Sequence, residues 1–185
     1  DRKMQKLNDE NETMNNFAKH KSDMQNTAMD SKFMKSVLAA RQNGVNIGDD
    51  KIEYLRDKWI DAQLNGTSGS DFVRNITSDG EFATDYQHLF ADDRFNFDYE
   101  HGFAENGKKA ALITSMSKAN SDLSDNDTLR NVTGVSSVRN FNELDNASKQ
   151  AKNRASTIER DVYAQTEGSS KYRTAKAIRE NNSNK

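Results

Sequence analysis

The chain has 185 residues, with 27 Lys and Arg side chains against 29 Asp and Glu, and it contains no cysteine and no proline. Without cysteine it has no disulfide, no thiolate metal site and no cysteine nucleophile. Only 33 % of the residues are hydrophobic and the mean hydropathy is −1.03, so we expect a thin core. No segment approaches the roughly 18 apolar residues of a membrane span. Because helix interiors reject proline, its absence favours an all-α fold.

The nearly balanced charges argue against a fully disordered chain. We expect one helical domain over 31–180, with a joint at 66–70 where Gly, Thr and Ser interrupt the apolar pattern. Residues 1–30 are expected to form a helical extension in which partial disorder stays open, and 181–185 a disordered tail. Residue 1 is Asp rather than Met, so we expect a processed or excised chain, and the sequence leaves its compartment open.

In chain order, residues 1–30 carry a broken heptad, which predicts a helix completed by tertiary packing. Two clearer helices follow, over 31–43 and from Asp49 or Asp50 to Leu64, each with a glycine just after its end. Two helices joined by a short turn are also the arrangement of a DNA-binding helix-turn-helix motif. The second helix, however, holds five acidic residues against three basic ones, which argues against contact with phosphates.

Short helices are expected over 70–76 and 81–90. Residues 93–99 then alternate polar and aromatic side chains, which is the period of a strand and the only strand signal in the chain. One strand cannot form a sheet. The segment therefore either pairs with a partner chain or, as we favour, is an extended loop whose aromatic rings fill the helical core. Its aromatic residues are accordingly candidates for partner binding as well: Phe95, Phe97 and Tyr99.

Further helices are predicted over 105–118 and 142–166, separated by a loop, a short helix and a turn at Gly134. The last long helix has a narrow apolar stripe rich in alanine, which buries little area for each residue. We therefore expect a partner, or a second copy, to cover this stripe. The candidate partner-binding residues on it are Leu144, Ala151 and Ile158.

The charges are unevenly distributed along the chain. Residues 71–105 hold nine carboxylates and two arginines, whereas 139–185 hold ten basic and six acidic side chains. The asymmetry indicates two solvated faces, a contact between the middle and the tail, or a tail that meets an acidic partner. Nucleic-acid binding by the basic stretch 149–179 is disfavoured, because acidic residues interrupt it.

The densest set of reactive side chains lies in residues 81–105. Carboxylates and imidazoles act as general acids and bases or bind metals, so this region is the candidate site of a small hydrolase or metal-dependent enzyme. The catalytic candidates are Glu81, His88, Asp92, Glu100 and His101, and the metal candidates are His88, Asp92, Asp93 and His101. The spacing matches no HExxH, Walker A, GxGxxG or nucleophile-elbow motif, and we expect no cofactor.

The amphipathic helices and thin stripes together favour a non-enzymatic helical module for protein–protein interaction or structure in a larger assembly. The composition would suit a phage particle or a conjugation or secretion machine. The hydrolase or metal-dependent enzyme is the alternative, and it requires the candidates at 81–105 to converge in one cleft.

Overall fold

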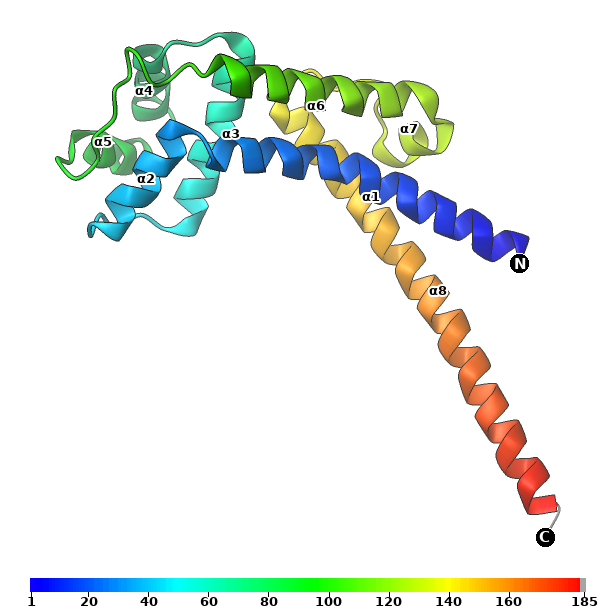
Figure 1. Ribbon diagram of the computed structural model, residues 1–185. Helices are drawn as coiled ribbons and strands as arrows, with labels where there is room; N and C mark the ends of the chain where they lie inside the picture. The colour runs from blue at the N-terminus through cyan, green and yellow to red at the C-terminus, as the bar shows by residue number, and fades with distance from the viewer. Residues whose placement is uncertain (184–185) are drawn as a thin grey trace.

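The computed structural model describes the backbone of residues 1–183 and the side chains of residues 1–166, 178 and 179. The described residues are mostly helical and contain no strand, which confirms the all-α prediction. Figure 1 shows the arrangement of the helices. The eight helices in the described part are α1 (Arg2–Met29), α2 (Lys32–Gln42), α3 (Asp49–Asn65), α4 (Gly69–Ser78), α5 (Ala83–Ala91), α6 (Asn106–Asp125), α7 (Asp127–Thr133) and α8 (Phe141–Ser183).

Local sequence signals set most helix ends. Ser31 caps α2 by accepting a hydrogen bond from the third residue of its first turn. Gly44 and Gly66 follow α2 and α3 with φ of 101° and 69°, a conformation that L side chains rarely adopt. Gly48, rather than an aspartate, is the N-cap of α3. Asp49 and Asp50, the two predicted caps, lie instead in the first turn of this helix, where negative charge interacts favourably with the helix dipole.

We call residues 1–162 the body. Its core lies where α1, α6, α3 and the first half of α8 meet (Figure 1). The helices α1 and α8 are antiparallel, because Lys21 pairs with Asp145 at 2.5 Å and Glu10 with Arg154 at 2.6 Å. Side chains buried in this core include Met14, Phe17, Trp59, Leu112, Leu123, Leu144, Ala151 and Ile158. The helix over 1–30 is thus completed by tertiary packing, as predicted.

Residues 93–99 form an extended loop, and their aromatic rings fill the core as favoured from the sequence. Phe95 is buried, whereas Phe97 and Tyr99 are half-buried. The ring of Phe33 on α2 meets Phe95 and Phe97 edge-on, with centroid distances of 6.0 and 5.4 Å. Edge-to-face pairs of this kind add stability beyond the area that they bury.

Two side-chain amides, the buried Gln63 and the half-buried Asn120, tie the loops to the helices. The Nε2 atom of Gln63 on α3 donates to the carbonyl of Phe103 at 2.8 Å, and its Oε1 accepts from the backbone N–H of Glu105 at 3.3 Å. Asn120 on α6 binds both the carbonyl and the N–H of Val138, at 3.0 and 2.7 Å. These bonds hold the loops before α6 and α8, because a buried backbone group needs a partner.

Two predicted boundaries differ from the structure. Residues 119–125, expected to be a loop, form the last turns of α6, since Ala119 and Leu123 pack into the core despite the acidic composition. The helix α8 extends beyond residue 166 to Ser183. Residues 184 and 185 lie outside the described residues, so the disordered tail over 181–185 stays a prediction.

The second half of α8 extends away from the rest of the molecule (Figure 1). We call residues 163–183 the arm. At about 1.5 Å for each residue, the 43 residues of α8 span about 65 Å. Among the described residues, no helix is long and apolar enough to span a bilayer.

Candidate functional site

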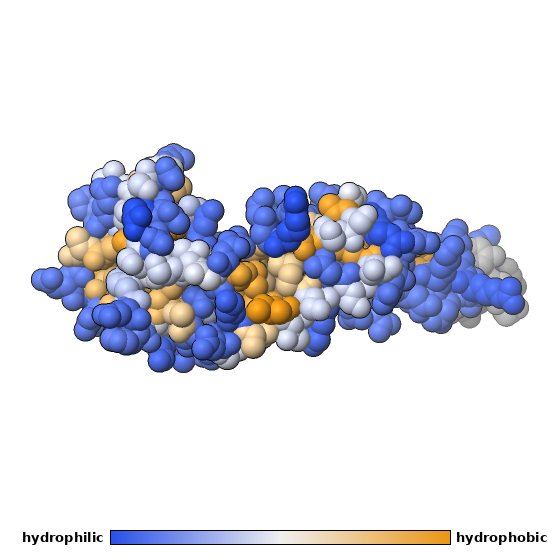
Figure 2. Space-filling view, turned by 90° about the horizontal axis from the view of Figure 1, so that it is seen from above, coloured by the Kyte–Doolittle hydropathy of each residue, from blue (hydrophilic) through white to orange (hydrophobic). Residues whose placement is uncertain are grey.

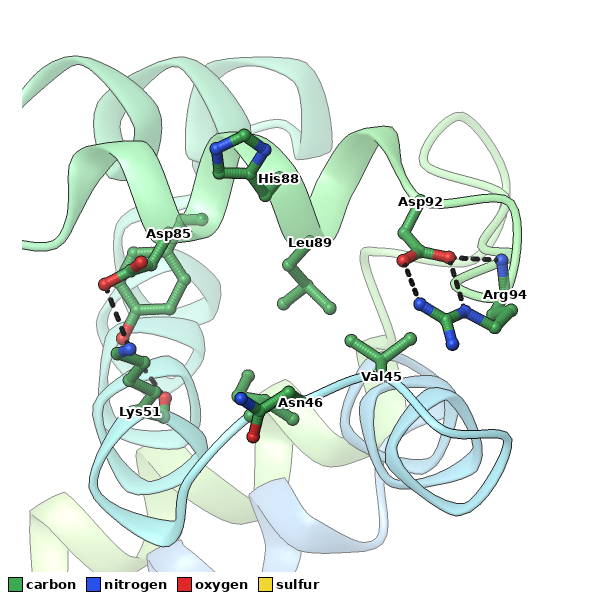
Figure 3. Close-up of a pocket in the computed structure, with 10 residues that line it drawn as sticks. Val45, Asn46, Lys51, Asp85, His88, Leu89, Asp92 and Arg94 are labelled. Atoms are coloured by element: carbon green, nitrogen blue, oxygen red, sulfur yellow. Dashed lines mark hydrogen bonds and ion pairs between the residues drawn. The ribbon is translucent and has the colours of Figure 1, made fainter.

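A cleft of about 200 Å³ lies between α5 and the segment that joins α2 to α3. Figure 3 shows Val45 and Leu89 facing each other across its apolar centre, with Asn46 at the lower edge. One side of the cleft is the segment that begins with Val45, directly after the turn at Gly44, and the other side is α5. The cleft is large enough for one side chain or a small polar molecule.

Two ion pairs flank the cleft (Figure 3). On one side, Lys51 Nζ lies 2.9 Å from Asp85 Oδ2. On the other, Arg94 donates to both carboxylate oxygens of Asp92, at 2.9 and 2.7 Å. The guanidinium lowers the pKa of Asp92 to about 2, mainly through these hydrogen bonds. Asp92 is therefore ionised at neutral pH and already paired, which makes it a poor general acid.

His88 is exposed on α5 and lies above the cleft in Figure 3. Its ring makes no hydrogen bond to any described group. A histidine that acts as a general base is normally oriented by a second polar group. The cleft thus brings together His88 and Asp92 from the predicted set without the geometry of a catalytic pair.

The remaining candidates at 81–105 lie outside this cleft. Glu81, Asp93 and Glu100 are exposed, and His101 pairs with Asp98 at 3.2 Å on the surface, with 76 % of its side chain accessible. Within the described part of the chain, no group of three His, Asp or Glu side chains is placed to hold a metal ion. Apart from His88 and Asp92, the structure does not bring the predicted catalytic or metal-binding residues together in this cleft.

The residues predicted to bind a partner pack inside this chain. Leu144, Ala151 and Ile158 are fully buried, and the α1–α8 contact covers their stripe. In the extended loop over 93–99, which we call the aromatic loop, Phe95 is buried and Tyr99 is half-buried. Desolvation raises the pKa of Tyr99. The stripe and the loop are therefore occupied by their own chain, and the exposed apolar surface lies elsewhere.

Five large apolar side chains with described exposure are at least 39 % accessible, and the sequence did not single them out as binding residues. They are Tyr54 and Phe82 near α5, Ile113 on α6, and Tyr163 and Ile178 on the arm. Figure 2 shows a largely hydrophilic surface with small apolar patches. Spacing along the chain gave no signal that separates these side chains from buried ones, and single exposed apolar residues are common on protein surfaces.

Comparison with models of protein families, with curated proteins and with solved structures gives no match to this chain.

Proposed function

We propose that this chain is a non-enzymatic protein–protein interaction module, in which the helical body holds out the arm as its docking element. One observation carries the proposal. Of the large apolar side chains with described exposure, the two most exposed are Tyr163 at 68 % and Ile178 at 57 %, and both belong to the arm. Contact with another protein would remove these apolar side chains from water, which favours association.

The physical state of the arm supports the same proposal. Helix α8 is covered in its first half, where Ile158 is fully buried, but Tyr163 already lies in solvent. Most helices in proteins are stabilised by tertiary packing rather than by intrinsic propensity. The arm also contains Gly168 followed by two serines, residues that lower helix propensity. Packing against a partner would supply the stabilisation that the body does not.

A role in a larger assembly, such as a phage particle or a conjugation or secretion machine, is the extension of this proposal that the composition favours. The body would act as the anchor and the arm as the connector. The paired state of Asp92 and the dispersed carboxylates and histidines at 81–105 make hydrolysis the weaker alternative.

The test compares the full chain with a variant that ends at residue 162. Because the arm is expected to add nothing to the body, both should melt at the same temperature in circular dichroism. A photo-crosslinking amino acid is then placed at Tyr163, at Ile178 or at the matched body position Ile113, which is also exposed, in extracts of the source cells.

We expect defined protein adducts from positions 163 and 178 and few from position 113. A lower melting temperature of the shortened chain would show that the arm belongs to the fold of the body. Adducts from position 113 alone would place the docking surface on α6. Either result would contradict the proposal.

A further inference from the structure

The chain separates its charges between two distant regions. Residues 49–105, which contain α3, α4, α5 and the aromatic loop, hold fourteen carboxylates against five Lys and Arg, a net charge of −9. On the arm, residues 171–179 hold four basic residues and no carboxylate. Complementary charge of this size steers association between surfaces that carry the two signs.

The acidic region also presents exposed aromatic rings. Tyr54 on α3 and Phe82 at the start of α5 are 39 % and 40 % accessible, and Tyr54 stacks on Tyr86 with a centroid distance of 5.5 Å. Tyr86 itself is buried, so we call the two exposed residues, Tyr54 and Phe82, the aromatic face. The ammonium groups of Lys51 and Lys58 already lie 5.4 and 5.3 Å from the rings of Phe82 and Tyr54. Each exposed ring thus already lies within cation–π distance of an ammonium group of its own chain.

Carboxylates beside this face are available for pairing. Asp79 and Glu81 precede Phe82 in the chain and are exposed. Neither forms an ion pair with any side chain that the structure describes. An incoming cation would therefore meet both an aromatic ring and an unpaired carboxylate, which is more specific than a charged surface alone.

The arm cannot reach the aromatic face of its own chain. Helix α8 starts beside α3, where the N–H of Phe141 donates to Asp61 at 2.9 Å. The helical rise of about 1.5 Å for each residue then places residue 171 about 45 Å further along α8. In Figure 1 the arm and the α4–α5 end lie at opposite ends of the molecule. Any contact between the two regions must therefore join different molecules.

We propose that residues 171–179 of one molecule dock on the aromatic face of a second copy of this chain, so that copies associate head to tail. The inference rests on the proposed function, since it names the partner of the arm. Such an interface joins two different surfaces, so an associated pair of copies keeps one free face on the first copy and one free arm on the second. Copies therefore add one after another into rings or linear chains, and the size of the assembly grows with concentration.

The test is sedimentation velocity of the nuclease-treated full chain at several concentrations and two ionic strengths. Size should grow with concentration at low salt and fall towards the monomer at about 1 M salt, where charges are screened within about 3 Å. An arm variant, Lys171→Glu with Lys176→Glu, and a face variant, Asp79→Lys with Glu81→Lys, should each associate about tenfold more weakly.

Matched variants make the test specific. Mixing the arm variant with the face variant should restore association, because the acidic arm then meets a basic face. Two exposed lysines on the body supply the charge control, Lys19→Glu with Lys118→Glu, which should associate like the unmodified chain. Phe82→Ala should weaken association about tenfold, whereas Ile113→Ala, the same type of change on α6, should not.

A monomer at every concentration and salt, or a mixture of the two variants that does not associate, would overturn the inference. So would association that nuclease treatment removes, which would assign the basic segment to nucleic acid. Crosslinks from the arm to a different protein would still support the proposed function in those cases. Loss of self-association would therefore overturn only the head-to-tail contact, whereas the absence of arm crosslinks to any protein would overturn the proposed function.

Discussion

Replacing Gln63 with leucine should destabilise the protein strongly, because this side chain serves two backbone groups from a buried position. Gln63 is 3 % accessible. The substitution leaves the carbonyl of Phe103 and the N–H of Glu105 without their side-chain partner. A buried polar group left unpaired costs about 1–3 kcal/mol. Since Glu105 is only half-buried, we expect a loss of about 2–4 kcal/mol in the free energy of unfolding, a large share of the stability of a typical domain.

Urea unfolding followed by fluorescence measures this loss, because the chain has one tryptophan, Trp59, which is fully buried on the same helix. Gln87→Leu is the matched control. The Nε2 atom of Gln87 donates to the carbonyl of Thr77 at 2.7 Å, but on the exposed surface, so its loss should cost under about 1 kcal/mol. Equal losses for the two variants would refute the argument that the buried amide of Gln63 holds the segment before α6.

Three further predictions follow from burial, close contact and charge. Ile158→Ala should lower the unfolding free energy by about 2–5 kcal/mol, whereas Ile178→Ala on the arm should leave the thermal midpoint unchanged; equal midpoints would contradict the boundary between body and arm. Gly69→Ala should cost about 1–3 kcal/mol in urea unfolding, because its Cβ would lie 2.8 Å from a backbone oxygen of the aromatic loop; an unchanged midpoint would contradict this close packing. Arg94→Gln should raise the pKa of Asp92 from about 2 towards its ordinary 3.8, as measured by carbon NMR titration. The pair stabilises the fold above pH 3.8 and loses this effect as the pH falls towards 2, so the variant should show a weaker pH dependence there.

The sequence predicted those helix ends that depend on local chemistry. Ser31 caps α2, and the glycines Gly44, Gly66 and Gly134 follow helices with positive φ, because these effects act within one turn. The predicted end of α6 at residue 118 was wrong. The Asp-rich residues that follow are held in the helix by contacts with distant parts of the chain. Local propensity contains no information about such contacts.

At the candidate site, too, local sequence patterns were predictable and contacts between distant segments were not. Spacing along the sequence marked the stripe with Leu144 and Ile158 as apolar, but it could not indicate that α1 covers it. Likewise, the acids and histidines at 81–105 are close in sequence, yet only His88 and Asp92 line one cleft. The turn before α5 and the extended loop after it place the other side chains in solvent.

By itself, the sequence predicted an all-α chain and determined that charge is divided between the middle and the tail, and it favoured the entry of the rings at 93–99 into the core over pairing with a partner chain. Periodicity, caps and composition are local properties, and they are sufficient for these conclusions. Only the tertiary structure decided which apolar stripe is covered, which carboxylates are paired and which part of α8 projects from the body. These depend on contacts between segments more than a hundred residues apart, such as Glu10 with Arg154, which no local pattern specifies.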